Sequence, residues 1–302
     1  MMTEIQKQAL QKLSTVRFDE PMAKHTTFRV GGPAEAYAVP TEEELPGLLA
    51  FAKDEQIPVT VLGNGSNVLV ADSGLAGLVI SIGESIAEIA ISGKETRVGA
   101  GAMIASVAKA AGEAGLAGLE FAGGIPGSVG GAVVMNGGAY GGEMADVLAS
   151  VTVLDEAGGQ KTYSADELAL SYRHSIFMEE AHRGDIILSA VMKLEKGNAD
   201  DILARMADFN ARRREKQPLE FPSAGSTFKR PEGNFAGKLI QEAGLAGYRA
   251  GGAQVSEKHC GFVINAKDAT AADVLAVIRH VQSKVEETSG IRLEEEVRLL
   301  GF

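Results

Sequence analysis

The feature that most limits what this chain can fold into is an uncharged stretch from Phe121 to Gly142, 22 residues long, which contains nine glycines. It is long enough to cross a bilayer, because a spanning helix takes about 20 apolar residues. A spanning segment must satisfy its backbone groups internally, however, and a helix this rich in glycine and interrupted by Pro126 would not be stable. The stretch therefore predicts loop structure and not a membrane span.

The first part of this stretch, from Gly123 to Gly131, is typical of a loop that binds phosphate. Small residues at most positions let successive backbone N–H groups point at one anion, with no Cβ in the way. The alternative is a turn between strands in which glycine permits close backbone packing. The segment favours a diphosphate ligand and leaves the structural turn open.

A second glycine loop, from Gly63 to Asn67, directly follows a predicted strand. Arg29, Gly31 and Gly32 are candidates for a third side of the same ligand site. Alone, such a five-residue loop fits a plain turn as well as a ligand loop. Two separate glycine loops in one chain indicate a dinucleotide.

Other ligand motifs are weak. Gly99 and Gly101 imitate the opening of a Rossmann fingerprint, but Ile104 stands where its third glycine belongs, so that fold is disfavoured. The five histidines lack metal-ligand spacing and the single cysteine, Cys260, adds no ligand set, so no metal is expected. One cysteine also gives no disulfide, and residues 1–13 lack the apolar core of a signal peptide, so we expect a cytoplasmic protein.

The net charge of −11 disfavours nucleic acid and membrane surfaces as partners. An anionic substrate must then be captured by a local group of cations. One such group closes a predicted helix and consists of Arg212, Arg213, Arg214 and Lys216.

The hydrophobic pattern predicts an α+β protein in which strands and helices do not alternate strictly. Strands are expected over residues 35–39, 58–62, 75–82, 86–91, 96–98, 148–154, 161–163, 186–194, 261–265 and 292–300, with a hairpin turn at 156–159. Helices are expected over residues 1–13, 42–56 with Thr41 as N-cap, 103–114, 199–216 and from the Thr270 capping box to Ser289. The helix over 199–216 is expected to open the last domain.

Candidate catalytic groups lie in three places: Tyr172 with Arg173, the segment Gly225 to Lys229, and Glu296. Each has an ordinary alternative, because an arginine is usually a surface residue and a serine after glycine is usually a turn residue. Glu296 could likewise lie on the polar face of the last predicted strand.

Taken together, these blocks resemble the UDP-N-acetylenolpyruvoylglucosamine reductase family over nearly the whole chain. The segments that carry the resemblance are Thr26-Thr27-Phe28-Arg29-Val30-Gly31-Gly32, Gly63 to Val70, Gly123 to Gly138, Ser171-Tyr172-Arg173-His174-Ser175, Lys216-Gln217-Pro218, Ala224-Gly225-Ser226-Thr227-Phe228-Lys229 and Leu293 to Gly301. The short chain between Arg173 and Asp185 resembles the type II variant, which lacks the loop with a substrate-clamping tyrosine. Arg230, where some members carry asparagine, and Glu295, where many carry proline, depart from the family pattern.

The resemblance implies a two-part FAD-binding region of the vanillyl-alcohol-oxidase (PCMH) type followed by a C-terminal α+β substrate-binding domain. The expected divisions are residues 1–83, 84–197 and 198–302. The implied activity is FAD-dependent, NADPH-driven reduction of UDP-N-acetylglucosamine enolpyruvate to UDP-N-acetylmuramate. The partners are then this sugar nucleotide and NADPH, and no obligate protein partner is inferred.

The family assigns the catalytic roles to Ser226, Glu296 and Arg173, with Ser226 as proton donor and the other two beside the developing negative charge. Glu296 can assist only if it is protonated or shares a proton. The residues expected to bind FAD are Arg29, Leu62, Gly63, Asn64, Gly65, Ser66, Asn67, Ala122, Gly123, Gly124, Ile125, Pro126, Gly127, Ser128, Gly130, Gly131, Ala132 and Asn136. Those expected to bind substrate are Tyr172, Arg212, Lys216 and Lys229.

Two alternatives remain. One is a flavin oxidase of the same fold, which would often tether its flavin covalently through a histidine, although none lies between Val59 and Val70. The other is a non-catalytic nucleotide-binding protein, for which the glycine loops alone would suffice.

Overall fold

The computed structural model describes residues 1–155, 157–182 and 184–302. The chain groups into two compact units, each described by itself below. Unit 1 comprises Met1–Phe18, Ala36–Asn64 and Gly77–Arg213, and unit 2 comprises Asp19–Glu35, Gly65–Ala76 and Arg214–Phe302. The mixture of helices with mainly antiparallel sheets confirms the expected α+β class.

Unit 1 is centred on a five-stranded antiparallel sheet with the order β12-β11-β13-β7-β6. Its strands are β6 (Ile89–Ser92), β7 (Glu95–Gly99), β11 (Leu148–Leu154), β12 (Gln160–Ser164) and β13 (Ile186–Lys193). Val98, Val151 and Ala190 alternate with more exposed neighbours and are almost fully buried, as a sheet with one face in the core requires.

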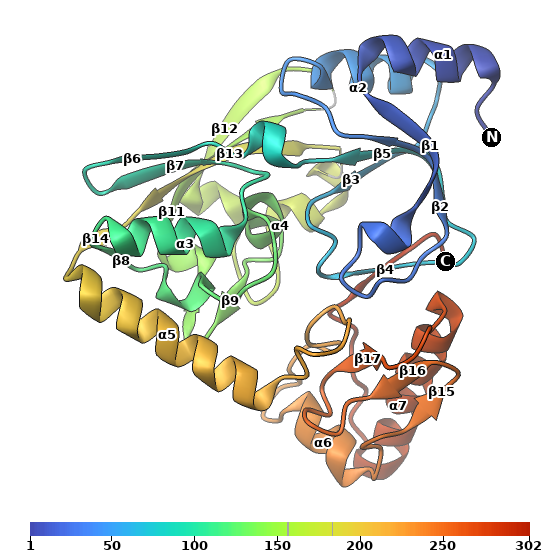
Figure 1. Ribbon diagram of the computed structural model, residues 1–302, viewed down its shortest axis with the longest axis vertical. Helices are drawn as coiled ribbons and strands as arrows, with labels where there is room; N and C mark the ends of the chain where they lie inside the picture. Colours follow the sequence, from blue (N-terminus) through green and yellow to red (C-terminus); the bar gives the residue numbers. More distant parts are fainter. Residues whose placement is uncertain (156, 183) are drawn as a thin grey trace. The chain divides into compact units, whose positions relative to one another are not determined.

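The helices of unit 1 are α1 (Glu4–Leu13), α2 (Leu45–Asp54), α3 (Ile104–Glu113), α4 (Val129–Val134) and α5 (Ala199–Lys216), the last of which is grouped here as far as Arg213. Figure 1 draws α3 between the five-stranded sheet and α5. The two helices are in contact, because a Cβ at Gly112 of α3 would lie 3.1 Å from Leu203 of α5. Helix α5, expected to open the last domain, therefore packs within unit 1, whereas the boundaries at 83/84 and 197/198 stay a prediction.

A second, four-stranded sheet has the order β1-β2-β5-β3, with β3 parallel to β5. Its strands are β1 (Val16–Pro21), β2 (Pro33–Ala38), β3 (Val59–Leu62) and β5 (Leu75–Ser81), and the division between the units falls within β1, β2 and β5. Two short antiparallel pairs also lie in unit 1: β8 (Leu116–Ala117) with β14 (Glu195–Lys196), and β9 (Gly138–Ala139) with β10 (Gly142–Glu143).

Unit 2 is built around α7 (Ala271–Ser289), whose apolar face includes Val274, Val277 and Val281, all fully buried. The sheet β15-β16-β17 packs on this helix, and β4 pairs in parallel with β18. These elements are β4 (Val68–Val70), α6 (Ala236–Glu242), β15 (Arg249–Ala250), β16 (Ala253–Val255), β17 (Val263–Asn265) and β18 (Arg298–Leu300).

Short 3-10 segments connect the longer elements. They are η1 (Met22–Lys24), η2 (Glu84–Ile86), η3 (Glu120–Ala122), η4 (Met144–Asp146), η5 (Ala165–Leu168), η6 (Ile176–Met178) and η7 (Glu180–His182).

Several expected elements are confirmed closely. Helix α5 has the expected bounds, and α7 begins at the Thr270–Asp273 capping box and ends where Gly290 takes a left-handed conformation, with φ of 70°. The hairpin of β11 and β12 also forms, although Glu156 in its expected turn lies outside the described residues.

Several expectations are wrong at their ends. Helix α1 begins at Glu4 and β17 at Val263, against expected starts at residues 1 and 261. Helix α2 begins at Leu45 and not at Glu42, because Glu44 N donates to Thr41 O in a preceding turn and Pro46 suits the first turn of a helix. The strand expected over 86–91 is interrupted by η2, so β6 begins at Ile89. The last strand spans only Arg298–Leu300, so Glu296 lies before it in irregular chain.

Candidate active site

The first two glycines of the long run pack closely against side chains of α5. A Cβ at Gly123 would lie 2.7 Å from Met206 Cε, and one at Gly124 would lie 2.5 Å from Asn210 Oδ1. The same helix satisfies their carbonyl groups, since Asn210 Nδ2 donates to Gly123 O at 3.4 Å and Arg213 donates to Gly124 O. For this pair, close packing against α5 is an observed role, and a contact with FAD stays a prediction.

The next part of the run has the features of a phosphate site. Gly127 and Ser128 are buried, and their backbone N–H groups donate to no acceptor among the residues that the structure describes. Buried N–H groups without an acceptor are uncommon because they cost free energy. These two amides therefore fit an anionic ligand.

The two glycine loops meet inside unit 1. The side-chain amide of Asn64 donates to Pro126 O at 2.6 Å. A Cβ at Gly63 would collide with Ser128 Oγ, so glycine is needed there for the close approach. This pairing supports the expectation that both loops bind one large ligand.

Other residues that were expected to bind FAD form hydrogen bonds or are buried within unit 1. Gly130 N donates to Ala100 O, and Gly131 N donates to Ser128 Oγ, which caps α4. Leu62, Ala122 and Ala132 are buried, and Ile125 is partly buried beside the core of unit 1.

Asn136 is fully buried and its side chain bonds within the protein. Its amide nitrogen donates to Ser171 O at 3.0 Å, and its amide oxygen accepts from Ala145 N at 2.9 Å. Asn136 therefore braces the segment that carries Arg173, and a contact with cofactor stays a prediction.

Tyr172 and Arg173 form the tip of a tight turn. Ser171 and His174 exchange backbone hydrogen bonds of 3.2 and 3.0 Å, and Arg173 has φ of 56°. A positive φ is uncommon outside glycine and is found disproportionately at functional sites. Half-buried Arg173 also donates to Gly138 O at 3.4 Å, while Tyr172 is 51% exposed and lies under the guanidinium.

In unit 2, Arg29 also has a positive φ, of 56°, and its backbone N donates to Thr26 O. Gly65 has φ of 61°, and its carbonyl accepts from Thr27 N at 3.1 Å. The buried hydroxyl of Thr27 has no hydrogen-bond partner among residues 1–155, 157–182 and 184–302. The amide of Ser66 likewise donates to no described acceptor, so this loop also offers free polar groups to a ligand.

The expected proton donor and the expected acid lie on neighbouring segments of unit 2. Glu296 N donates to Thr227 O at 2.8 Å, directly after Ser226, and Phe228 forms a β-bridge with Glu295. Both Ser226 and Glu296 are partly buried. The fold therefore brings together two residues that are 70 positions apart in the chain.

The other side of Glu296 is held by the second glycine loop. Asn67 Nδ2 donates to Glu296 O at 3.0 Å, and Arg298 N donates to Asn67 O at 3.0 Å. Asn67 was expected only to bind FAD. No sequence signal links residues so far apart, and this positioning contact was missed.

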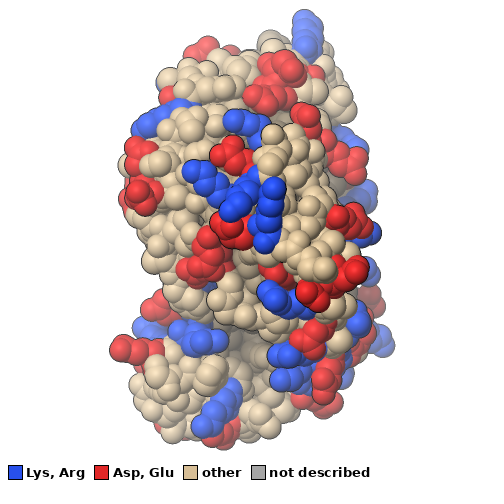
Figure 2. Space-filling model, turned by 90° about the vertical axis from the view of Figure 1, so that its left-hand side faces the viewer, with Lys and Arg blue, Asp and Glu red and all other residues tan. Residues whose placement is uncertain are grey.

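The expected substrate-binding cations are mostly exposed and paired. Arg212 bonds Asp208 at 2.7 Å, and Lys229 bonds Glu294 at 3.2 Å, while Lys216 is exposed at the end of α5. On the face shown in Figure 2, several Lys and Arg side chains lie beside one another, with Asp and Glu side chains around them. The predicted roles of these cations in substrate binding stay predictions.

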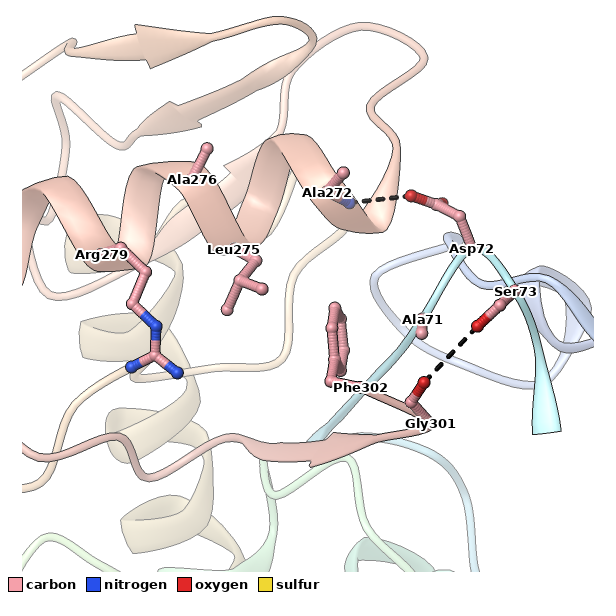
Figure 3. A pocket seen from close by; sticks show the side chains of 9 residues that line it. All are labelled: Ala71, Asp72, Ser73, Ala272, Leu275, Ala276, Arg279, Gly301 and Phe302. Carbon is pink, nitrogen blue, oxygen red and sulfur yellow. Dashed lines mark hydrogen bonds between the residues drawn. The ribbon is translucent and has the colours of Figure 1, made fainter. Parts of the chain in front are cut away.

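A separate hollow in unit 2 contains none of the expected site residues (Figure 3). It is lined mainly by apolar groups of α7 and the chain end, with Asp72 accepting from Ala272 N at 2.9 Å at one edge. Arg279, which also lines it, donates to Gln282 and Glu295.

Two kinds of feature are absent from the described part of the chain. None of its helices combines the length and hydropathy needed to traverse a bilayer. Among the same residues, no group of three His, Cys, Asp or Glu side chains is arranged to hold a metal ion.

Comparison with known proteins first defines a class. Residues 33–164 match the family model of an FAD binding domain, and residues 217–300 match that of the UDP-N-acetylenolpyruvoylglucosamine reductase C-terminal domain. The chain is thus a flavoprotein with an FAD-binding domain and a second domain of the reductase type. This agrees with the fold class expected from the sequence.

Full-length relatives then give the family. UDP-N-acetylenolpyruvoylglucosamine reductase of Agathobacter rectalis is 56% identical over 94% of this chain and 93% of its own, and that of Syntrophomonas wolfei is 48% identical over 95% of each. The crystal structure of UDP-N-acetylenolpyruvylglucosamine reductase (MurB) from Thermus caldophilus matches with a TM-score of 0.80 and 38% identity, covering 95% of this chain and 98% of that one. The chain belongs to the UDP-N-acetylenolpyruvoylglucosamine reductase family.

Proposed function

We propose that this protein reduces UDP-N-acetylglucosamine enolpyruvate to UDP-N-acetylmuramate, a step of peptidoglycan precursor synthesis, with NADPH as the electron source and FAD as cofactor. The observation that carries this proposal is the backbone pairing that sets Ser226 beside Glu296 in a chain whose glycine loops fit a flavin nucleotide. Family membership supports the same conclusion.

The residues present fit FAD. The buried amides of Gly127 and Ser128, and the close approach of Gly63 to Ser128, form a cradle that a Cβ would fill. We assign the cofactor's phosphates to these loops of unit 1. When bound, FAD would accept a hydride from NADPH and pass it to the substrate.

Arg173 and Glu296 are proposed to stabilise charge. Addition of hydride to the terminal carbon of the enolpyruvyl ether leaves negative charge on the carbon beside the carboxylate. A preorganised guanidinium and a protonated carboxyl group both stabilise such an enolate. The tight turn that fixes Arg173 and the bonds at both sides of Glu296 reduce the reorganisation that this stabilisation would cost.

Ser226 is proposed to donate the proton that completes the reaction. Its O–H bond breaks as a C–H bond forms at the carbon beside the carboxylate, so the hydride and the proton together saturate the double bond. A serine hydroxyl is a weak acid in water, but a carbanion is a stronger base, and fixed geometry makes the transfer favourable.

The uridine diphosphate is proposed to meet Tyr172, Arg212, Lys216 and Lys229. Arg212 and Lys229 would have to exchange Asp208 and Glu294 for the phosphates, which costs little because exposed ion pairs are worth about 0–1 kcal/mol. We further propose that the enzyme acts in the cytoplasm, where the single cysteine stays reduced.

The test follows the two half-reactions of the purified protein without oxygen. NADPH should bleach the flavin absorbance, and UDP-N-acetylglucosamine enolpyruvate should restore it with formation of UDP-N-acetylmuramate. Bleaching without recovery would contradict the substrate assignment. The flavin oxidase alternative predicts instead that denaturation leaves the flavin attached to the chain, whereas free cofactor is expected here.

A further inference from the structure

Thr227 joins three segments of unit 2. Its backbone N donates to Gly261 O at 2.9 Å, and its side-chain oxygen accepts from Val263 N, the first residue of β17, at 3.0 Å. Its carbonyl accepts from Glu296 N at 2.8 Å. Every backbone and side-chain oxygen or nitrogen of this residue is therefore used in the protein.

The residue is also rigidly enclosed. Thr227 is 1% exposed, and its neighbour Phe228 is 3% exposed in the core of unit 2. The hydrogen bond to its hydroxyl oxygen is buried, so it is not exchanged for water. Loss of that acceptor would leave the Val263 amide unsatisfied and shift the chain at residue 227.

Such a shift would reach two groups of the proposed reaction. Ser226 is bonded covalently to Thr227, and Glu296 is tied to the Thr227 carbonyl. Gly225, on the other side, has φ of 76° and nothing within 4 Å of the position that a Cβ would take, so no side chain packs at that point. The observed hydrogen bonds next to Ser226 are those of Thr227.

We propose that Thr227 is a positioning residue that sets the spacing of Ser226 and Glu296 by anchoring their shared backbone contact to β17. The inference rests on the proposed function, since it concerns the step in which Ser226 would donate its proton. Its effect on the reaction comes from its own fixed backbone, which sets the positions of Ser226 and Glu296.

The experiment compares Thr227→Val, which keeps the shape but removes the acceptor, with Thr227→Ser, which keeps the acceptor. For Thr227→Val we expect flavin reoxidation by UDP-N-acetylglucosamine enolpyruvate to slow by about tenfold or more, since small misplacements are costly in catalysis. Flavin reduction by NADPH should be unchanged. Thr227→Ser should restore most of the reoxidation rate.

Val277→Ala is the matched control, because Val277 is fully buried in the same core but takes no part in these hydrogen bonds. It should lower the melting temperature and leave both half-reactions intact. Equal slowing by Val277→Ala and Thr227→Val, or equal loss in both half-reactions, would overturn the proposal.

If Thr227→Val does not fold, Thr227→Ser still decides the matter, because loss of reoxidation in a variant that keeps the acceptor contradicts the proposal. The wild-type protein separates this outcome from failure of the proposed function. If wild-type flavin is not reoxidised by the enolpyruvyl substrate, the function itself is wrong, whatever the variants do.

Discussion

The side-chain amide of Asn67 donates a hydrogen bond of 3.0 Å to the backbone carbonyl of Glu296. Asn67 ends the second glycine loop and directly precedes β4, while Glu296 directly precedes the approach to β18, the parallel partner of β4. The contact therefore fixes the expected acid at the point where the two strands begin. It gives Asn67 a role that differs from that of Asn64, three positions earlier in the same loop.

Replacement of these two asparagines should have different effects. Asn64→Ala removes the bond to Pro126 O in the glycine run and should weaken FAD binding. Asn67→Ala removes the support of Glu296 and should slow reoxidation by substrate by about 10- to 100-fold, with less effect on FAD binding. FAD affinity is measured by fluorescence on titrating apoprotein, and reoxidation by rapid mixing.

Each asparagine variant serves as the control for the other. If Asn67→Ala lost FAD as readily as Asn64→Ala and reoxidised normally when saturated with it, Asn67 would be a cofactor residue only. That result would remove the proposed link between the loop and Glu296.

The sequence was sufficient for elements with a strong local signal. The capping box at Thr270 and Asp273 and the terminal Gly290 fix α7 by local chemistry, and regular apolar spacing defines α5. Local signals failed for residues 292–297, where alternation suggested a strand. There the chain pairs with Thr227 and Asn67 instead, and those partners are set by tertiary structure.

The prediction of the site was limited in the same way, because local signals were readable and tertiary contacts were not. Glycine spacing pointed to both loops, but it could not separate Gly123 and Gly124, which pack closely against side chains of α5, from Gly127, whose buried amide donates to no described acceptor. The two kinds of glycine have the same sequence signal. Only the neighbours in three dimensions distinguish them.

Ser226→Ala should leave flavin reduction by NADPH intact and slow reoxidation by the enolpyruvyl substrate by about 10²- to 10⁴-fold, the usual contribution of a general acid. Ser223→Ala is the control, because Ser223 lies in the same segment and its β-bridge to Ile264 uses only the backbone. Rapid-mixing absorbance separates the two half-reactions. Equal slowing of both would show that Ser226 is not the proton donor.

Gly63→Ala should weaken FAD binding, because the new methyl group collides with Ser128 Oγ and pushes the two loops apart. Overpacking of this kind costs about 1–3 kcal/mol, or roughly 5- to 150-fold in affinity if it falls on the bound state. The double variant Gly63→Ala/Ser128→Ala should recover part of the loss, since Ser128 Cβ would be 3.6 Å from the added carbon.

The single variant Ser128→Ala supplies the reference for this cycle. It loses the acceptor for Gly131 N, so it carries a cost of its own that must be subtracted. Strictly additive losses in the double variant would mean that the loops do not meet as described.

His259 should make the protein less stable in mild acid. Burial lowers the pKa of His259, against a smaller opposing effect of a backbone hydrogen bond. Its Nδ1 accepts from Gly261 N at 3.1 Å, which requires an unprotonated nitrogen. The unfolded chain therefore binds more protons than the native protein as the pH falls through about 6.5, and the free energy of unfolding should decrease on acidification over this range.

His259→Asn tests this dependence, since an amide oxygen can accept the same backbone hydrogen bond but does not titrate. The difference in unfolding free energy between wild type and variant, measured by urea titration, should be constant above about pH 7.5 and should move in favour of the variant on acidification towards about pH 5.5. The other four histidines are present in both proteins, so their contributions cancel in this difference. A difference that does not change with pH would mean that His259 is protonated as easily in the native protein as in the unfolded chain, which would contradict the role of its Nδ1 as an acceptor for Gly261 N.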